Sequence, residues 1–285
     1  MNNTTDYGQE PELAYALVFG SILVIGLPLN AFSLWTLLRH HSLKSPSAIY
    51  MVNLAISDLL LVISLPMRVY FYATGTWPLG KEACIGITML FLDNIRSSAI
   101  FITLISMDRL LAVVYPLRSR HLRTVCNTWK AVVLVWLFVG VLNITERVYL
   151  STILKGFDGA SCFEFPDHHT HRSPMAYLES ALGLTLLAVN IVCTTSVSWT
   201  LHKHLSDFAR VNSKVNVMLL FVMSLVIFAV CFLPPSIALL FMGRPLTTPY
   251  ICLASANCCM DPLLYYFSLD AFWKKKEDAD LAMEP

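Results

Sequence analysis

Seven long apolar runs follow one another along the chain, separated by short polar segments. They cover residues 13–38, 47–73, 84–114, 126–146, 175–201, 215–242 and 247–267. An α-helix needs roughly 20 apolar residues to cross the hydrocarbon core of a bilayer, and each run reaches about that length. The connections are too short to hold a soluble domain. The pattern therefore predicts an all-α membrane protein, with a seven-transmembrane helix bundle over residues 13–267.

The composition agrees with a membrane protein. The 285 residues are 56% hydrophobic and only 14% charged, and the mean hydropathy is +0.62. Soluble domains carry about 25% charged residues, so a soluble protein or a nucleic-acid-binding domain is not expected. The sequence contains neither an HExxH nor a GxSxG motif. We therefore do not expect an enzyme.

Positively charged residues concentrate in alternate segments between the runs. Residues 1–12 contain acids but no Lys or Arg, whereas the segments after the first, third, fifth and seventh runs are basic. The basic residues there are Arg39, Lys44, Arg118, Arg120, Arg123, Lys203, Arg210, Lys214, Lys274, Lys275 and Lys276. By the positive-inside rule these segments lie in the cytoplasm. An extracellular N-terminus and a cytoplasmic C-terminal end require an odd number of spans, as expected for a multi-pass plasma-membrane protein.

The two segments outside the bundle carry signals of their own. In the extracellular tail, 1–12, overlapping Asn-x-Thr sequons predict glycosylation at Asn2 and Asn3. In the segment 268–285, apolar and basic residues alternate as far as Lys276. This alternation predicts a short amphipathic helix on the inner leaflet, followed by a short cytoplasmic tail.

Two of the eight cysteines have extracellular positions. Cys84 begins the third span, and Cys162 lies in the longest external loop. Because the extracellular side is oxidising, we expect a disulfide between them that holds the 147–174 loop over the mouth of the bundle. Two unpaired thiols are the alternative. The other six cysteines lie in or beside the spans and are expected to pack as small apolar side chains.

A charged pair, Asp108-Arg109, ends the third span, where charge is costly and usually serves a switch. The segment 106–117 that contains it reads SMDRLLAVVYPL. It resembles the third-helix signature of rhodopsin-like (class A) G-protein-coupled receptors. The resemblance implies a receptor with heterotrimeric G proteins as partners, and arrestin as a further one. In such a switch Arg109 is released from Asp108 and meets the G protein.

Two proline-containing segments extend the resemblance. The sixth span contains CFLP at 231–234, similar to the family's kinked hinge, with Phe232 where many members have Trp. The seventh ends in DPLLY at 261–265, with an acid where many members have Asn. Pro234 and Pro262 lack an amide donor and permit bending, so each is a candidate hinge. We assign Phe232, both prolines and Tyr265 to the switch.

Polar side chains inside the spans form a second candidate site. Asp58, Ser98, Asn257 and Asp261 resemble the polar, sodium-binding core of the same family. Two carboxylates in a low dielectric need a cation or a proton between them. We therefore expect Na⁺ as an allosteric ion and no other cofactor. In the alternative, these groups only hydrogen-bond the helices together.

Some positions depart from the family pattern. The fifth span has no proline and carries Thr194 near the usual tyrosine, and Leu110 replaces an aromatic residue after the charged pair. The link at 242–249 is very short. These departures bear on signalling and on the extracellular pocket rather than on the fold.

One buried arginine suggests the charge of the ligand. Arg68 lies ten residues beyond Asp58, about 15 Å further along the second span. A cation inside a membrane protein needs a partner, and an anionic ligand is one. No acid lies three or four residues from Arg68 along its helix. We therefore expect Arg68 to bind an anionic ligand.

A second arginine leaves two interpretations open. Arg96 lies twelve residues after Cys84, about 18 Å deep and directed toward the fourth and fifth spans. It either contacts the ligand or pairs with an acid of the bundle. The candidate acids are Asp93, Glu146 and Glu179.

Three further residues complete the expected ligand site: Phe71, Phe91 and Arg244. Phe91 stands near the position where amine receptors carry an acidic counter-ion, so an amine ligand is not expected. The segments LPMRVYFY (65–72), WPLG (77–80) and NCCMDP (257–262) resemble the purinergic-type branch, most closely the non-Edg lysophosphatidic acid receptors. In that type an arginine at the Arg68 position engages the phosphate head group.

The resemblance thus implies a lysophospholipid-like ligand, with an apolar roof suited to an acyl chain. The roof residues are Phe71, Leu239, Leu240, Phe241 and Met242. A nucleotide or a small carboxylate is the alternative ligand. A transporter or channel is the alternative class, supported by the buried charges. The first three spans do not resemble the last three, and this argues against a repeat-built transporter.

Overall fold

The computed structural model describes residues 12–40, 43, 45–153, 162–163, 174–203, 211–242 and 248–266. Four sequence predictions lie outside these residues: glycosylation at Asn2 and Asn3, the ligand contact of Arg244, and the amphipathic helix in 268–285.

Long helices dominate the described chain, which contains no strand. They are α1 (Leu13–His40), α2 (Pro46–Thr74), α3 (Gly80–Val114), α4 (Val125–Ile153), α5 (Pro174–Lys203), α6 (Val211–Ile227), α7 (Leu233–Met242) and α8 (Thr248–Ser255). A π-helical turn, η4 (Phe228–Phe232), joins α6 to α7, and a 3₁₀ helix, η1 (Arg118–His121), precedes α4. After a turn at Ala256 a helical run continues over 257–266.

Six helices of the described chain are long and apolar enough to cross a membrane, the sixth being Val217–Phe241 through η4. The seventh predicted span corresponds to α8 together with 257–266. Three predicted spans were too short: α3 begins at Gly80 rather than at 84, α6 begins at Val211 rather than at 215, and α4 continues to Ile153 rather than ending at 146. The seven-helix bundle expected from the apolar pattern is confirmed.

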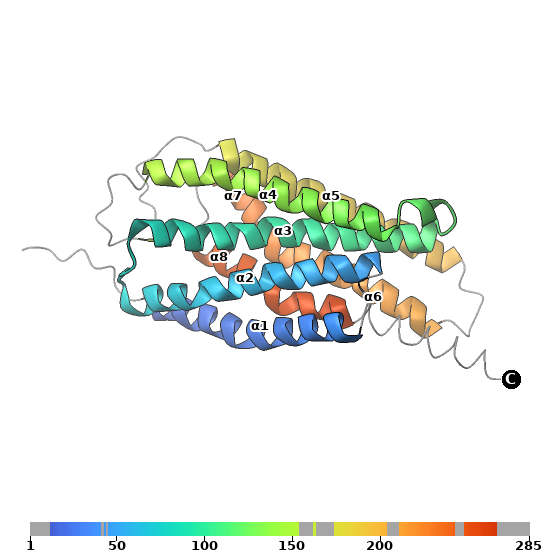
Figure 1. Ribbon diagram of the computed structural model, residues 1–285, viewed down its shortest axis with the longest axis horizontal. Coiled ribbons are helices and arrows are strands. Elements are labelled where there is room, and N and C mark those ends of the chain that lie inside the picture. The colour runs from blue at the N-terminus through green and yellow to red at the C-terminus, as the bar shows by residue number, and fades with distance from the viewer. Residues whose placement is uncertain are drawn as a thin grey trace, which may run out of the picture.

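The helices lie side by side, with α3 in the middle of the bundle. It packs against α2, α4 and α5, while α1 packs on the far side of α2, and α5 also contacts α6 and α7 (Figure 1). Large apolar side chains such as Val24 and Trp199 cover the outside, and polar ones such as Ser98 and Asn190 are fully buried. This inside-out pattern is the one that a bilayer requires.

A short turn and a disulfide shape one end of the bundle. Gly75 ends α2 with φ 67°, and its amide donates to the Phe71 carbonyl at 2.8 Å, a left-handed cap that glycine adopts without steric cost. The predicted disulfide joins Cys84 at the start of α3 to Cys162 and is confirmed. We call this the disulfide end, and the opposite one the Asp108 end.

The predicted hinge of the sixth span coincides with an irregular helical turn. In η4 the Leu233 amide donates to the Phe228 carbonyl five residues earlier. Pro234 and Pro235 follow, and neither can donate to the carbonyl four residues before it. Because π-turns mark places where a helix is already irregular, η4 is compatible with a hinge at Pro234, and the hinge itself stays a prediction.

Two residues of the expected apolar roof are exposed. Phe241 is 75% and Leu240 37% exposed, whereas Leu239 is buried. Side chains two positions apart on an α-helix, such as those of Leu239 and Phe241, point in directions that differ by about 200°. Both could therefore not face the interior. Phe241 therefore faces the surrounding lipid and not a pocket.

Candidate functional site

Arg68 lies in a cage of aromatic rings at the disulfide end. Its side chain is only 1% exposed. Its guanidinium carbon lies 4.2 Å from the ring centroid of Phe163, 4.7 Å from that of Phe91 and 6.0 Å from that of Phe19. We call these four residues the Arg68 cage. The cage brings together α1, α2, α3 and the residue that follows the disulfide cysteine.

The charge of Arg68 is incompletely compensated by the described residues. Its Nε and Nη1 atoms are buried and have no hydrogen-bond partner among them. Burial of an ion costs several kcal/mol even after relaxation, whereas each aromatic face returns about 0.5–2 kcal/mol. The rings therefore stabilise the cation only in part. The cage is suited to an anion that can accept hydrogen bonds from both nitrogens.

Aromatic packing supports the Phe163 ring that covers the cage. The Phe163 ring meets Phe71 and Trp77 edge-on, at centroid distances of 5.3 Å in each case. Trp77 in turn donates to the Gly80 carbonyl at 2.7 Å. Phe163 adopts a φ of 38°, which is unusual for a residue other than glycine. The disulfide holds this residue in place as a roof over Arg68.

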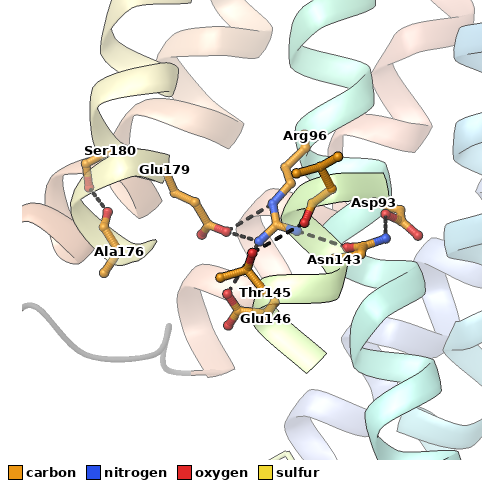
Figure 2. Close-up of polar contacts among 9 residues, drawn as sticks. Asp93, Arg96, Asn143, Thr145, Glu146, Ala176, Glu179 and Ser180 are labelled. Carbon is orange, nitrogen blue, oxygen red and sulfur yellow. Dashed lines mark hydrogen bonds and ion pairs between the residues drawn. The ribbon is translucent and has the colours of Figure 1, made fainter. Parts of the chain in front are cut away.

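Arg96 occupies a different site, in a cluster of charged and polar groups that joins α3, α4 and α5. Figure 2 shows its guanidinium between Glu179 on α5 and Glu146 on α4. It forms a close ion pair with Glu179, lies 3.7 Å from Glu146, and donates to the Asn143 side chain at 3.0 Å. Asn143 also donates to Asp93. We call these five residues the Arg96 cluster.

The pairing of Arg96 with acids across the bundle is confirmed, and its predicted direction toward α4 and α5 is correct. The acid on its own helix, Asp93, bonds Asn143 instead. Arg96 also lines a mostly apolar crevice between α3, α5 and the η4–α7 segment, beside Phe232 and Leu239. Three carboxyl groups surround this one cation, so the cluster is less suited than the Arg68 cage to an anionic ligand. A ligand contact for Arg96 remains a prediction.

The predicted sodium-site residues are all fully buried near the middle of the bundle: Asp58, Ser98, Asn257 and Asp261. The Asp58 Oδ1 atom accepts from Asn94 at 2.9 Å and from Ser98 at 3.3 Å. The carboxyls of Asp58 and Asp261 are near enough to interact. We call these residues, with Asn94, the polar core.

The polar core has the donor atoms that a hard cation prefers. Asp58 Oδ2, both carboxyl oxygens of Asp261 and the amide of Asn257 are buried and receive no hydrogen bond from a described donor group. Carboxylate, hydroxyl and amide oxygens are the ligands of small hard cations. The residues present therefore fit a cation as well as a shared proton.

Of the remaining switch residues, Phe232 lines the crevice, whereas Pro262 and Tyr265 follow Asp261 in the helical run 257–266. Phe232 is buried and packs on Phe228 at a centroid distance of 5.1 Å. Tyr265 is also buried, and its hydroxyl has no hydrogen-bond partner among the described residues. Pro262 lies in the helical run 257–266, four residues after Cys258.

At the Asp108 end, the sequence did not indicate the partners that hold Asp108. Its carboxylate accepts from Arg123 at 2.7 Å and 3.2 Å, and from the Ser47 hydroxyl at 2.5 Å. Adjacent residues on a helix do not face each other, so Asp108 is directed at α2 and at the segment before α4 rather than along its own helix toward Arg109. We call Ser47, Asp108 and Arg123 the Asp108 cluster.

At the rim, Arg147 pairs with Glu82 at 3.0 Å, both being largely exposed. Lys81 donates to the Ser151 carbonyl at 2.9 Å. Arg147 thus pairs with Glu82 rather than with Glu146, its neighbour in sequence. An exposed pair of this kind contributes at most about 1 kcal/mol.

Sequence reasoning missed two members of the Arg68 cage, Phe19 and Phe163. The position of Phe163 carried a signal, because it directly follows the disulfide cysteine Cys162 and must lie beside the start of α3. Phe19 carried none, since it lies in an apolar run whose residues all resemble a lipid-facing surface. Only the packing of α1 on α2 places it against Arg68.

Comparisons with known proteins show similarity to seven-transmembrane receptors. The sequence pattern of the family described as "7 transmembrane receptor (rhodopsin family)" matches residues 29–265. Lysophosphatidic acid receptor 6 of Gallus gallus is 34% identical over 277 residues, covering 90% of both chains. Lysophosphatidic acid receptor 5 of Bos taurus is 36% identical over 285 residues, covering 90% of this chain and 76% of the relative. Lysophosphatidic acid receptor 4 of Homo sapiens is 31% identical, with 90% and 75% covered.

Proposed function

Because the chain belongs to the rhodopsin family of seven-transmembrane receptors, we propose that its ligand is a lysophospholipid whose phosphate pairs with Arg68. The observation that carries this proposal is the buried guanidinium whose Nε and Nη1 lack partners among the described residues. A phosphate offers several acceptor oxygens, and two of them can accept from the planar fork of donors on a guanidinium. The names of the similar receptors, lysophosphatidic acid receptors 4, 5 and 6, agree with a single-chain phosphate lipid.

The aromatic walls favour a lipid over the two alternative anions. Phe19, Phe91 and Phe163 present apolar surface around Arg68, and no second described cation lies within the cage. A nucleoside diphosphate or triphosphate would bring several negative charges, which one arginine cannot neutralise. A single phosphate on an apolar chain matches one cation in an apolar surround.

The response of the receptor follows from differential binding. The ligand shifts the equilibrium only as far as it binds the active state more tightly than the resting one. We infer that the resting state keeps Asp108 on Arg123 and Ser47, and that bending at η4 and Pro234 opens the Asp108 end. Arg109 then meets a heterotrimeric G protein, and arrestin is a further partner. In this proposal the Asp108 end is cytoplasmic and the N-terminus is extracellular, because the basic connecting segments lie at the Asp108 end.

The polar core is proposed to hold Na⁺ in the resting state. Asp58 and Asp261 would supply the carboxylate ligands, with Ser98 and Asn257 beside them. Bound there, the ion would neutralise two carboxylates in a low dielectric and so stabilise the packing of α2, α3 and 257–266. Without the ion, the same residues share a proton or repel each other.

The test is G-protein activation in cells that express the wild-type protein or Arg68→Gln, with surface expression measured alongside. The panel contains lysophosphatidic acid, the uncharged monoacylglycerol of the same chain, a nucleotide and a small carboxylate. We expect a response to lysophosphatidic acid alone, reduced at least about 30-fold in potency by Arg68→Gln, because a buried charged contact contributes about 2–5 kcal/mol. A full response of Arg68→Gln would overturn the assignment of Arg68.

A further inference from the structure

Two buried hydroxyl groups lie beside the Arg68 cage and bond each other. The hydroxyl oxygen of Tyr72, on α2, and that of Thr248, at the start of α8, are hydrogen-bonded at 3.0 Å. Tyr72 is 2% and Thr248 8% exposed. A hydroxyl group removed from water costs free energy unless it is hydrogen-bonded, and each of these two supplies a partner for the other. We call Tyr72 and Thr248 the hydroxyl pair.

The hydroxyl pair lies one helical turn from Arg68. Residues four positions apart on an α-helix have Cβ atoms about 5–6 Å apart on the same face, and Arg68 and Tyr72 are separated by this distance along α2. Tyr72 is near enough to Arg68 to interact with it electrostatically. Phe19 connects the two, because its ring stacks on Tyr72 at a centroid distance of 5.5 Å and also belongs to the Arg68 cage. The pair and the cage are therefore neighbouring parts of one buried site.

Aromatic rings surround the Tyr72 side chain. Besides Phe19, the ring of Phe71 meets that of Tyr72 edge-on at a centroid distance of 5.2 Å, and the ring of Tyr15 does so at 5.6 Å. A polar group of a ligand that is buried among such rings loses its bonds to water, and leaving it without a new partner costs binding free energy. The hydroxyl pair therefore offers a place beside Arg68 where a polar group of a ligand can be hydrogen-bonded.

The chemistry of the pair matches a neutral hydroxyl group. A hydroxyl can donate one hydrogen bond and accept two, and the bond to Tyr72 uses one of these sites on Thr248. The Thr248 hydroxyl can therefore bond a third hydroxyl group while the pair itself stays bonded. A neutral group also brings no second charge into the apolar surroundings, where removing an ion from water is costly. The pair thus favours a ligand hydroxyl close to the phosphate.

We propose that the hydroxyl pair binds the glycerol hydroxyl of a lysophosphatidic acid while Arg68 binds its phosphate. The proposal rests on the assignment of the phosphate to Arg68. In this lipid the free hydroxyl is carried by the glycerol carbon next to the one that bears the phosphate, so both groups belong to one small head group and can contact neighbouring sites together. Tyr72 and Thr248 thereby make the receptor prefer glycerophosphate lipids over lipid phosphates that lack this hydroxyl.

The direct test is equilibrium binding of two ligands to the full chain in nanodiscs. One is lysophosphatidic acid, and the other is its analogue with propanediol in place of glycerol, which keeps the acyl chain and the phosphate but lacks the hydroxyl. We expect the wild type to bind lysophosphatidic acid about 2- to 12-fold more tightly, the ratio that the net free energy of one hydrogen bond gives. In the double variant Tyr72→Phe/Thr248→Val the ratio should fall to about 1, because neither side chain then carries a hydroxyl. A ratio that the double variant leaves unchanged would overturn the proposal, as would equal binding of the two ligands by the wild type.

Single variants and a matched control separate this role from a structural one. Tyr72→Phe keeps the ring that stacks on Phe19, and Thr248→Val keeps the branched shape of its side chain. Each should lower the ratio on its own, so the test does not depend on the folding of the double variant. The control is Tyr70→Phe, which removes a hydroxyl from a 42% exposed residue of the same helix and should leave the ratio at its wild-type value. If Tyr72→Phe weakens both ligands equally, the pair only joins α2 to α8 and the proposal fails.

A third ligand distinguishes this proposal from the proposed function. The monoacylglycerol of the same acyl chain lacks the phosphate, so its comparison with lysophosphatidic acid reports on Arg68 alone. If the wild type does not prefer the phosphate lipid, the assignment of the phosphate to Arg68 fails. If that preference is present and is lost in Arg68→Gln, while the hydroxyl ratio does not change in the variants of the pair, only the role of the hydroxyl pair fails.

Discussion

The ring of Phe163 lies 4.2 Å from the guanidinium carbon of Arg68, so the residue after the loop cysteine covers a buried cation. Arg68 has two nitrogens without partners among the described residues, whereas Arg96, one helix away, is held by Glu179 and Glu146. Two buried arginines in one bundle thus have opposite surroundings. The difference predicts opposite effects on stability.

Arg68→Met is expected to stabilise the ligand-free protein while abolishing its response. Replacing a poorly compensated buried ion by an apolar side chain of similar volume is often neutral or stabilising by about 1–4 kcal/mol. The measurement is the thermal midpoint of the purified receptor without ligand, together with G-protein activation. A lower midpoint than that of the wild type would show that other groups compensate the charge of Arg68.

Arg96→Met is expected to have the opposite effect to Arg68→Met and to destabilise the protein. Removing this cation leaves Glu146 and Glu179 partly buried beside each other without a counter-charge, and breaking a fully buried pair costs about 3–5 kcal/mol, which sets the upper limit here. We expect a clearly lower thermal midpoint than for Arg68→Met. Adding Glu179→Gln to Arg96→Met should restore part of the loss, because one of the two like charges is then removed. Failure of this rescue would show that the charges do not couple.

The Asp108 cluster is expected to restrain the resting state. Arg123→Gln removes the ion pair with Asp108 and should raise ligand-independent G-protein activation about 5-fold or more, as 1–3 kcal/mol of coupling implies. The control is Arg120→Gln, because Arg120 is exposed on η1. The readout is basal nucleotide exchange at equal surface expression. Equal basal activity in the two variants would remove Arg123 from the switch.

A close contact between α5 and α7 makes a separate prediction. A Cβ added at Gly183 would overlap the Ser236 hydroxyl and touch the Ser236 Cβ at 3.4 Å, while Ser180 donates to the Ser236 carbonyl at 2.8 Å. Gly183→Ala should therefore lower stability by about 1–3 kcal/mol through overpacking. Adding Ser236→Ala removes the overlapping atom and should restore the thermal midpoint. A double variant no better than the single one would mean that α5 itself had shifted.

The polar core predicts a response to salt. If Na⁺ holds Asp58 and Asp261 in the resting state, replacing Na⁺ by a bulky organic cation should raise agonist affinity severalfold. Asp58→Asn should abolish that dependence. The measurement is agonist binding at constant ionic strength, so that general screening does not change. A salt effect that persists in Asp58→Asn would place the ion elsewhere.

The sequence predicted the bundle, the disulfide and the direction of Arg96 because each depends on a strong local signal. Apolar length identifies spans, an extracellular cysteine pair identifies a disulfide, and a helical step of about 100° fixes which way a side chain points. These signals act along one element or through one covalent bond, so no knowledge of packing was needed.

The partners of buried charges could not be predicted in the same way. Arg123 lies in a connection, and its reach to Asp108 depends on the path of η1 between α3 and α4. Phe19 joins Arg68 only because α1 packs on α2. The π-turn of η4 was also unforeseen, since the sequence indicated a proline bend without the helical register on either side. Each of these features is set by contacts between elements.

The most direct test of the central claim is equilibrium binding of lysophosphatidic acid to the purified protein in nanodiscs, compared with the monoacylglycerol of the same chain. For the wild type we predict at least about 100-fold tighter binding of the phosphate lipid, and for Arg68→Gln a preference within about threefold of unity. A phosphate preference that survives Arg68→Gln undiminished would contradict the assignment of the phosphate to the Arg68 cage.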